Sequence, residues 1–182
     1  MSEVAKRYRV VADGFNARLE GVVPDGWAAA TPCSDWSVRD LVAHVAMTHR
    51  RVIATLDGTE PVDVDPETDL LAQWRGATDA VVSALGDESR APKLVTGMSG
   101  EQTFESLVGR LVCADTLIHT WDLARATGQD ETLDPDAVAK AMEALAPIDD
   151  AIRRPGGFAA KIAPVPGADA QTQFLNFCGR SR

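Results

Sequence analysis

The sequence predicts an all-α fold in which amphipathic helices pack together as a bundle. Long stretches of the chain carry apolar residues at three- and four-residue spacing, which is the period of a helix with one buried face. Ser37 precedes one of these stretches, and Gly86 and Gly128 follow two others, as expected at helix ends. The segments between them are rich in Gly, Pro, Ser and Asp and lack a hydrophobic period, which is typical of loops.

Composition narrows the class of protein. With 45% hydrophobic residues the chain can bury a real core, and we expect one domain over residues 1–182. The net charge of −9 argues against a nucleic-acid partner, because phosphate binding needs a basic face. The first residues form no apolar signal segment, and no apolar run is long enough to cross a bilayer. We therefore expect a cytoplasmic protein with no membrane partner.

Residues 3–127 are expected to hold four long helices and the segments that join them. An apolar stripe places the first helix over residues 3–19, and the following loop is expected to be pinned by Trp27 and Trp36. The second helix begins after Ser37, because Ser37 and Asp40 are close to a capping box, and continues to about residue 56. The later elements are a third helix over residues 67–85, an extended crossing over 88–102 and a central helix over 104–127 that stops at Gly128.

The C-terminal part is expected to be less regular. A fifth helix should begin near Pro135 and break or kink at Pro147, because proline starts a helix well and interrupts one. A Gly- and Pro-rich strap follows and ends in a short helix over residues 168–177. The long crossing before the central helix allows successive helices to run in the same direction, so the topology need not be simple up-and-down.

The three cysteines show no CxxC spacing, so we interpret them as free thiols in a reducing compartment. Cys113 lies within the central helix and is best explained as a small buried hydrophobe. Cys33 lies in a loop and Cys178 near the C-terminus, and neither has a His close in sequence. We therefore expect no cysteine catalysis.

Polar residues on the central helix suggest a metal site. Asp115, His119 and Asp122 fall within a stripe roughly 60° wide, because a helix turns about 100° per residue. An Asp and a His four residues apart can both reach one metal ion, as paired histidines do on zinc-binding helices. Asp122, one turn after His119, can accept a hydrogen bond from a ligand imidazole, although a surface salt bridge with Arg125 explains it equally well.

The second helix adds a further candidate ligand. His44 lies near its apolar face, whereas His49 lies about 140° round the helix, beside two arginines, and is expected to face solvent. Alone, His44 is more easily explained as a hydrogen-bonded core residue. Together, His44, Asp115 and His119 offer two nitrogens and one oxygen to a divalent metal and leave coordination positions open, as reactive zinc sites do.

Two segments carry a resemblance to a known family. TPCSDWSVRDLVAHV, residues 31–45, and ADTLIHTWDLARATG, residues 114–128, resemble the metal-binding domain of mycothiol-dependent maleylpyruvate isomerases, within the DinB/YfiT-like superfamily. The tail resembles that of an uncharacterised single-domain bacterial subgroup. The resemblance implies a DinB-like four-helix bundle, here with an additional C-terminal helix and extended tail, and a divalent metal, commonly zinc or nickel. It places the ligands at His44, Asp115 and His119, where Asp115 replaces a longer Glu of the isomerase.

The resemblance implies a thiol-dependent transferase or isomerase that acts on a small electrophile, with mycothiol or a similar low-molecular-weight thiol as cofactor. The isomerase has a further C-terminal domain that contributes to its active site, so the resemblance does not extend maleylpyruvate isomerisation itself to this chain. Two alternatives stay open: a metal-dependent hydrolase, and a non-catalytic protein whose metal or His/Asp cluster only ties the helices together. Many relatives form dimers, but no sequence stripe marks an interface, so a homodimer is left open.

Overall fold

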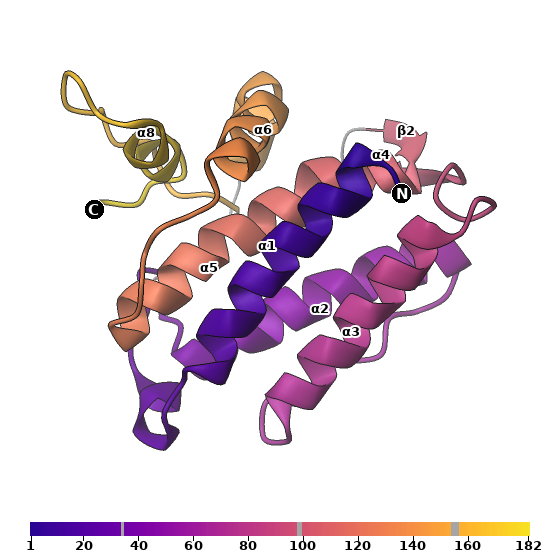
Figure 1. Cartoon of the computed structure of the whole chain (residues 1–182), viewed down its shortest axis with the longest axis horizontal. Coiled ribbons are helices and arrows are strands. Elements are labelled where there is room, and N and C mark those ends of the chain that lie inside the picture. Colours follow the sequence, from indigo (N-terminus) through magenta and orange to yellow (C-terminus); the bar gives the residue numbers. More distant parts are fainter. Residues whose placement is uncertain (34, 98–99, 154–156) are drawn as a thin grey trace.

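A computed structural model describes residues 1–33, 35–97, 100–153 and 157–182 of the chain. The prediction of an all-α fold is confirmed, because four long helices form a bundle and the two strands are short. Helices α1 and α2 each pack against both α3 and α5. In Figure 1, α1 and α5 run in one direction and α2 and α3 in the other. The bundle helices are α1 (Glu3–Glu20), α2 (Val38–Asp57), α3 (Leu70–Gly86) and α5 (Cys113–Thr127).

Helix ends follow the local chemistry of the sequence. The hydroxyl of Ser37 accepts a hydrogen bond from the Asp40 amide, and the Asp40 carboxylate accepts one from the Ser37 amide, which completes the predicted capping box of α2. The third helix begins at Leu70 rather than residue 67, because Asp69 caps it. At the end of α5, Gly128 adopts a left-handed conformation with φ of 67°.

The predicted central helix over 104–127 is helical throughout but not uniform. It consists of α4 (Phe104–Leu107), the π-helical turn η2 (Val108–Val112) and α5. The Cys113 amide bonds the Val108 carbonyl five residues earlier, which is the π-type bond. Gly109 lies in this turn where α1 comes close, since a Cβ there would lie 3.1 Å from Val4. The turn therefore sits at a tight helix contact.

The crossing before the central helix is extended as expected, and its strands pair with each other. Strands β1 (Leu94–Gly97) and β2 (Gly100–Thr103) form an antiparallel hairpin in which Leu94 lies opposite Thr103. This connection joins α3 to a helix of opposite direction. The connection that joins helices of the same direction is instead the 58–69 loop between α2 and α3, which runs back along the bundle (Figure 1).

Outside the bundle, shorter helices cover α5. The predicted break at Pro147 is present, because α6 (Pro135–Leu145) gives way to η3 (Ala146–Ile148) and α7 (Asp149–Ile152). Helix α8 (Ala170–Phe177) packs against α6, and both lie on the side of α5 away from α2 and α3 (Figure 1). Before α2, the short 3₁₀ helix η1 (Pro24–Ala28) lies in the loop that holds Trp27. No helix in the described residues is both long and apolar enough to cross a membrane.

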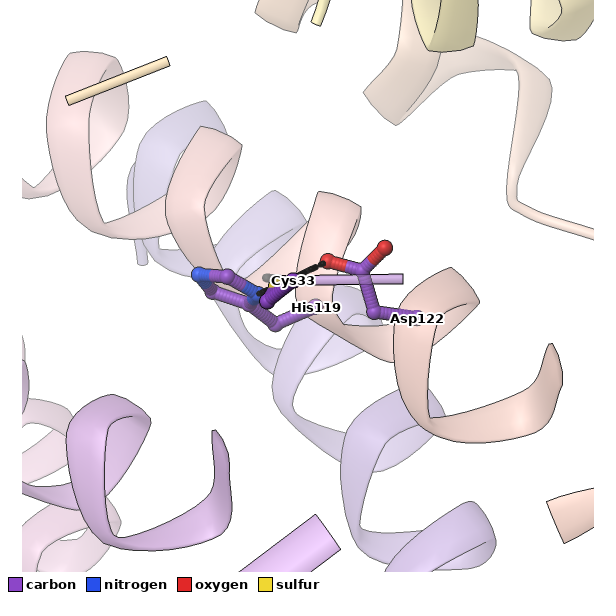
Figure 2. A group of neighbouring side chains, drawn as sticks. All are labelled: Cys33, His119 and Asp122. Atoms are coloured by element: carbon purple, nitrogen blue, oxygen red, sulfur yellow. Dashed lines mark hydrogen bonds and ion pairs between the residues drawn. The ribbon is translucent and has the colours of Figure 1, made fainter. Parts of the chain in front are cut away.

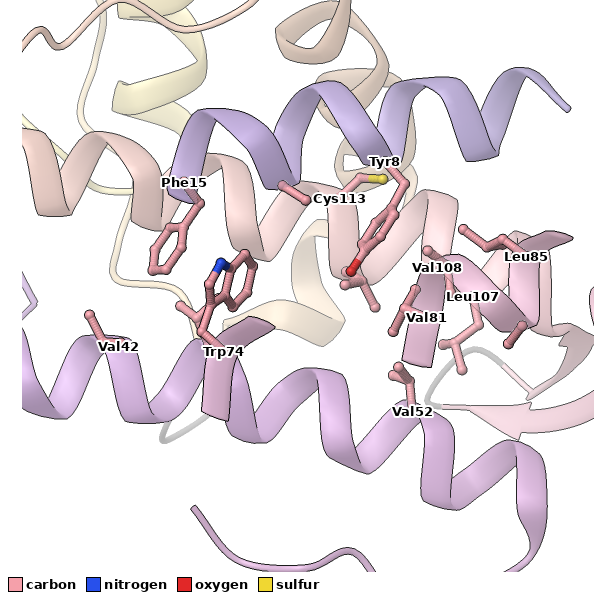
Figure 3. Packing of buried hydrophobic residues seen from close by; sticks show 14 of the residues in the cluster. Tyr8, Phe15, Val42, Val52, Trp74, Val81, Leu85, Leu107, Val108 and Cys113 are labelled. Atoms are coloured by element: carbon pink, nitrogen blue, oxygen red, sulfur yellow. The ribbon is translucent and has the colours of Figure 1, made fainter. Parts of the chain in front are cut away.

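Two hydrophobic clusters hold these layers together. One fills the bundle, where Phe15 and Trp74 meet with ring centroids 4.6 Å apart (Figure 3). The other joins α5 to α6 and α8 around Ile118, Trp121 and Phe174. Because α5 lies between the two clusters, nearly every residue from 113 to 124 is buried, polar ones included. The fold therefore places the candidate site residues of α5 in the interior.

Candidate metal centre

The structure brings the three predicted ligands together. Nε2 of His44, on α2, lies 3.5 Å from Oδ1 of Asp115, and Nε2 of His119 lies 3.7 Å from the same oxygen. The two imidazole rings meet edge to face, with centroids 5.1 Å apart. The side chains grow less exposed from 29% at His44 to 17% at Asp115 and 8% at His119. The group thus reaches from the interior toward the surface at His44.

The spacing of the donor atoms fits a metal ion. The ligand atoms of the three residues all lie within 4.8 Å of one another. Ligands bound tetrahedrally at about 2.0–2.1 Å lie roughly 3.3 Å apart, close to both of the distances measured to Asp115 Oδ1. Those distances are too long for strong hydrogen bonds. The three side chains therefore surround a common point without bonding tightly to each other.

Asp115 also has an unsatisfied oxygen. Its Oδ2 is buried and has no hydrogen-bond partner among the described residues. A buried carboxylate oxygen without a partner costs free energy, and a bound cation would remove that cost. Burial by itself would raise the pKa of Asp115, but the neighbouring histidines outweigh it and lower the pKa. The carboxylate is thus kept in the charged form that metal ligation needs.

The other ring nitrogen of His119 is held by Asp122. Nδ1 donates to Asp122 Oδ2 at 3.0 Å, as expected for Asp122 from its position one turn later. This bond keeps a proton on Nδ1 and directs Nε2 toward Asp115. Burial would lower the pKa of His119, but hydrogen bonds to Asp122 and Cys33 and the charge of Asp115 prevail and raise the pKa to about 10.

Asp122 does not pair with Arg125, so that alternative is wrong. Arg125 instead bonds Glu131 and lies over the Trp121 ring. Asp122 is fully buried and receives Arg180 from the C-terminal tail, with Arg180 Nε 3.1 Å from Oδ1 and Nη2 2.9 Å from Oδ2. Burial would raise the pKa of Asp122, but His119 and Arg180 outweigh it and lower the pKa to about 2.

Cys33 is a member of the site that the sequence did not reveal. Its Sγ lies 3.2 Å from Asp122 Oδ2, 3.8 Å from His119 Nδ1 and 3.1 Å from Arg180 Nη2. Figure 2 shows Cys33, His119 and Asp122 pointing toward one another. Cys33 precedes His119 by 86 residues, and Arg180 follows Asp122 by 58. Because these separations are so long, no local spacing in the sequence indicates either contact, and the absence of a His near Cys33 in sequence does not exclude one near it in space.

His49 does not face solvent as predicted but is fully buried. Its Nδ1 donates to the Val45 carbonyl at 2.8 Å, and its ring packs edge to face on Trp74 with centroids 4.8 Å apart. The prediction failed because α2 is covered on two sides, by α3 and by α5, so residues 140° apart can both be internal. Burial lowers the pKa of His49 to about 4, so it stays neutral.

The surface beside His44 is hollowed. A depression of about 570 Å³ is lined by His44, Trp36, Arg51 and three aspartates, Asp35, Asp40 and Asp63, among others. The Trp36 ring lies 4.7 Å from that of His44 and 6.0 Å from that of His119, between centroids. Trp36 therefore borders the site as well as packing the loop. Asp35, in the same turn, adopts a left-handed conformation with φ of 66°.

Comparison with known proteins agrees with this architecture. Residues 8–124 match the model of the mycothiol maleylpyruvate isomerase N-terminal domain. The chain belongs to this family. It is also 35% identical over 175 residues to each of two uncharacterised proteins, from two strains of Mycobacterium tuberculosis, and each match covers 93% of both chains. No solved structure matches the chain significantly. The family match ends before α6, so the C-terminal helices and Arg180 lie outside it.

Proposed function

We propose that His44, Asp115 and His119 bind a divalent metal ion, zinc or nickel, in a thiol-dependent transferase or isomerase that acts on a small electrophile. The observation that carries the proposal is the convergence of the Nε2 atoms of His44 and His119 on Asp115 Oδ1, beside a buried Oδ2 that has no partner in the described residues, at the edge of an open depression. The family match supports a thiol of the mycothiol type as the second reactant. A divalent ion in such a site supplies a nucleophile at neutral pH by lowering the pKa of a bound thiol or water.

The chain's own residues shape the site for this chemistry. Asp122 keeps the Nδ1 proton of His119, so that Nε2 is the nitrogen left to bind a metal, in exchange for its own proton. Trp36 packs beside both imidazoles and limits their rotation. Only the His44 side borders the depression, so we expect substrates to approach there, between Trp36 and Arg51. The three aspartates along that depression offer acceptors for hydroxyl and amide groups of a substrate.

Metal analysis tests the first part of the proposal. The untagged wild type should carry close to one metal ion per chain, and His44→Ala and His119→Ala should lose it. His49→Gln is the matched control, because it removes a buried histidine of α2 that contacts Trp74 rather than Asp115 Oδ1. It should keep the metal. A wild type that carries none and cannot be loaded with zinc or nickel would refute the proposal.

Turnover assays separate the three functional alternatives. The metal-loaded protein is incubated with electrophilic substrates in the presence and absence of mycothiol. Thiol-dependent turnover that His119→Ala abolishes supports a transferase or isomerase, whereas turnover without thiol supports a hydrolase. If the metal-loaded wild type turns over no substrate, and His119→Ala melts at a lower temperature than the metal-loaded wild type, the metal is structural.

A further inference from the structure

The C-terminal tail reaches the site through one arginine. Arg180 follows α8 and lies beyond the region that matches the family. Its side chain is only 10% exposed, and its Nη1 donates to the Cys178 carbonyl at 2.9 Å. The remaining contacts go to Asp122 and Cys33. The buried guanidinium of Arg180 therefore binds the same carboxylate that bonds His119, so it can influence the orientation of that imidazole.

The backbone that delivers Arg180 is fixed by Gly179. This glycine has a φ of 76°, and a Cβ there would lie 2.7 Å from Ala159. The turn is closed by bonds from the Gly179 amide to the Asn176 carbonyl and from the Arg180 amide to the Leu175 carbonyl. The end of α8 therefore turns the chain tightly, and Arg180 points back to α5 rather than into solvent.

The guanidinium holds Asp122 by two parallel bonds. Nε binds Oδ1 and Nη2 binds Oδ2, which fixes the plane of the carboxylate. The same Oδ2 accepts the Nδ1 proton of His119. A carboxylate fixed in this way holds the imidazole in one orientation, and such supporting groups typically change metal affinity about 10–100-fold when removed.

We propose that Arg180 is a positioning residue of the metal centre: its two bonds fix Asp122, and Asp122 fixes His119 with Nε2 toward Asp115 and His44. The C-terminal helix is then part of the site and not only a cover for the bundle. Because this inference rests on the proposed metal binding by His119, its test needs one measurement that does not depend on a metal.

The first measurement follows the Nδ1 proton of His119 by nuclear magnetic resonance of metal-free, ¹⁵N-histidine-labelled protein. The chain has three histidines, so a His119→Gln variant assigns the signal. In wild type the proton should be shifted downfield and protected from exchange by its bond to Asp122. In Arg180→Met the signal should shift and exchange faster. Arg182→Met is the matched control, because Arg182 pairs with exposed Asp169 in the same tail, and it should leave the signal unchanged.

The second measurement is zinc affinity, by competition with a chromogenic chelator, together with the visible spectrum of the cobalt-loaded protein. Arg180→Met should bind zinc about 10–100-fold more weakly and show an altered cobalt spectrum. Arg180→Lys, which keeps the charge but not the two parallel bonds, should fall between Arg180→Met and wild type. If Arg180→Met does not fold, Arg180→Lys still tests the proposal. Combined with Asp122→Asn, Arg180→Met should add little further loss, because both act through one contact.

The outcomes separate the two proposals. A folded Arg180→Met or Arg180→Lys variant with the wild-type Nδ1 signal overturns the positioning role. If the wild type binds zinc, a folded Arg180→Met variant that binds zinc with the same affinity as the wild type also overturns the positioning role. Additive effects of Arg180→Met and Asp122→Asn on affinity also overturn it. A wild type that binds no metal refutes the proposed function alone, because the Nδ1 signal still decides whether Arg180 fixes His119.

Discussion

The two ring nitrogens of His119 face regions of opposite character. On the Nδ1 side, Asp122 accepts bonds from His119, Arg180 and Cys33, so its buried charge is fully compensated. On the Nε2 side, Asp115 touches His119 and His44 only at 3.5 Å or more, and its Oδ2 has no partner in the described part of the chain. The difference teaches that one buried carboxylate is fully paired within the fold, whereas the other keeps an oxygen that no described group of the protein satisfies.

The largest change in stability is expected when Asp122, the fully paired carboxylate, is removed. Asp122→Ala leaves Arg180 buried without its partner and His119 without its acceptor, so the free energy of unfolding should fall by about 3–5 kcal/mol. Urea denaturation of metal-free protein measures it. A loss below about 1 kcal/mol would show that Asp122 is no better compensated than Asp115.

A metal ion bound at Asp115 and the two histidines should stabilise the folded protein. Zinc at about 100 times its dissociation constant should raise the free energy of unfolding by roughly 3 kcal/mol, and a chelator should reverse the gain. Thermal unfolding with and without zinc measures this shift. Asp115→Ala, which removes the shared oxygen, should show no gain. An equal gain in Asp115→Ala would place the ion elsewhere.

His49 provides a buried histidine without a bonded carboxylate, against which His119 can be compared. Burial lowers its pKa to about 4, below that of an unfolded histidine, so the unfolded state takes up more protons between these values. Stability should therefore fall as the pH drops through this window, with a loss of roughly 2 kcal/mol between pH 7 and pH 5. Urea titrations of wild type and His49→Gln should differ by this amount. Parallel pH profiles would contradict the prediction.

The smallest effect should come from Asp115 in the metal-free protein. Asp115→Ala removes only contacts longer than ordinary hydrogen bonds and an unsatisfied oxygen, so stability should change by less than about 1 kcal/mol. Urea denaturation beside Asp122→Ala gives the direct contrast. A loss as large as that of Asp122→Ala would remove the distinction between the two carboxylates.

Sequence periodicity predicted the bundle and the position of the three candidate ligands. Asp115, His119 and Asp122 share a face because of their spacing alone, and His44 follows from its place on the apolar side of α2. The structure places them together, but metal binding itself stays a prediction. The assignment of His49 to solvent failed because periodicity gives an angle around a helix and not the number of neighbours that cover it.

The contacts of Cys33 and Arg180 with Asp122 could not be predicted from periodicity. Cys33 comes from a loop and Arg180 from the turn after α8, and their approach to Asp122 depends on how α5, α6 and α8 pack. Only Gly179 carried a local signal, since a glycine after a short helix indicates a tight turn. Where that turn directs the next side chain is a property of the tertiary structure.

The π-helical turn at Val108–Val112 determines the direction in which the side chains of α5 point around the helix axis. A π turn holds one more residue than an α turn of the same kind, so the residues that follow are rotated by roughly 100° relative to an unbroken α-helix. Deletion of one residue there would leave the composition and periodicity of α5 intact, yet turn Asp115 and His119 away from His44. In this chain, a single insertion or deletion upstream can decide whether the motif forms a site.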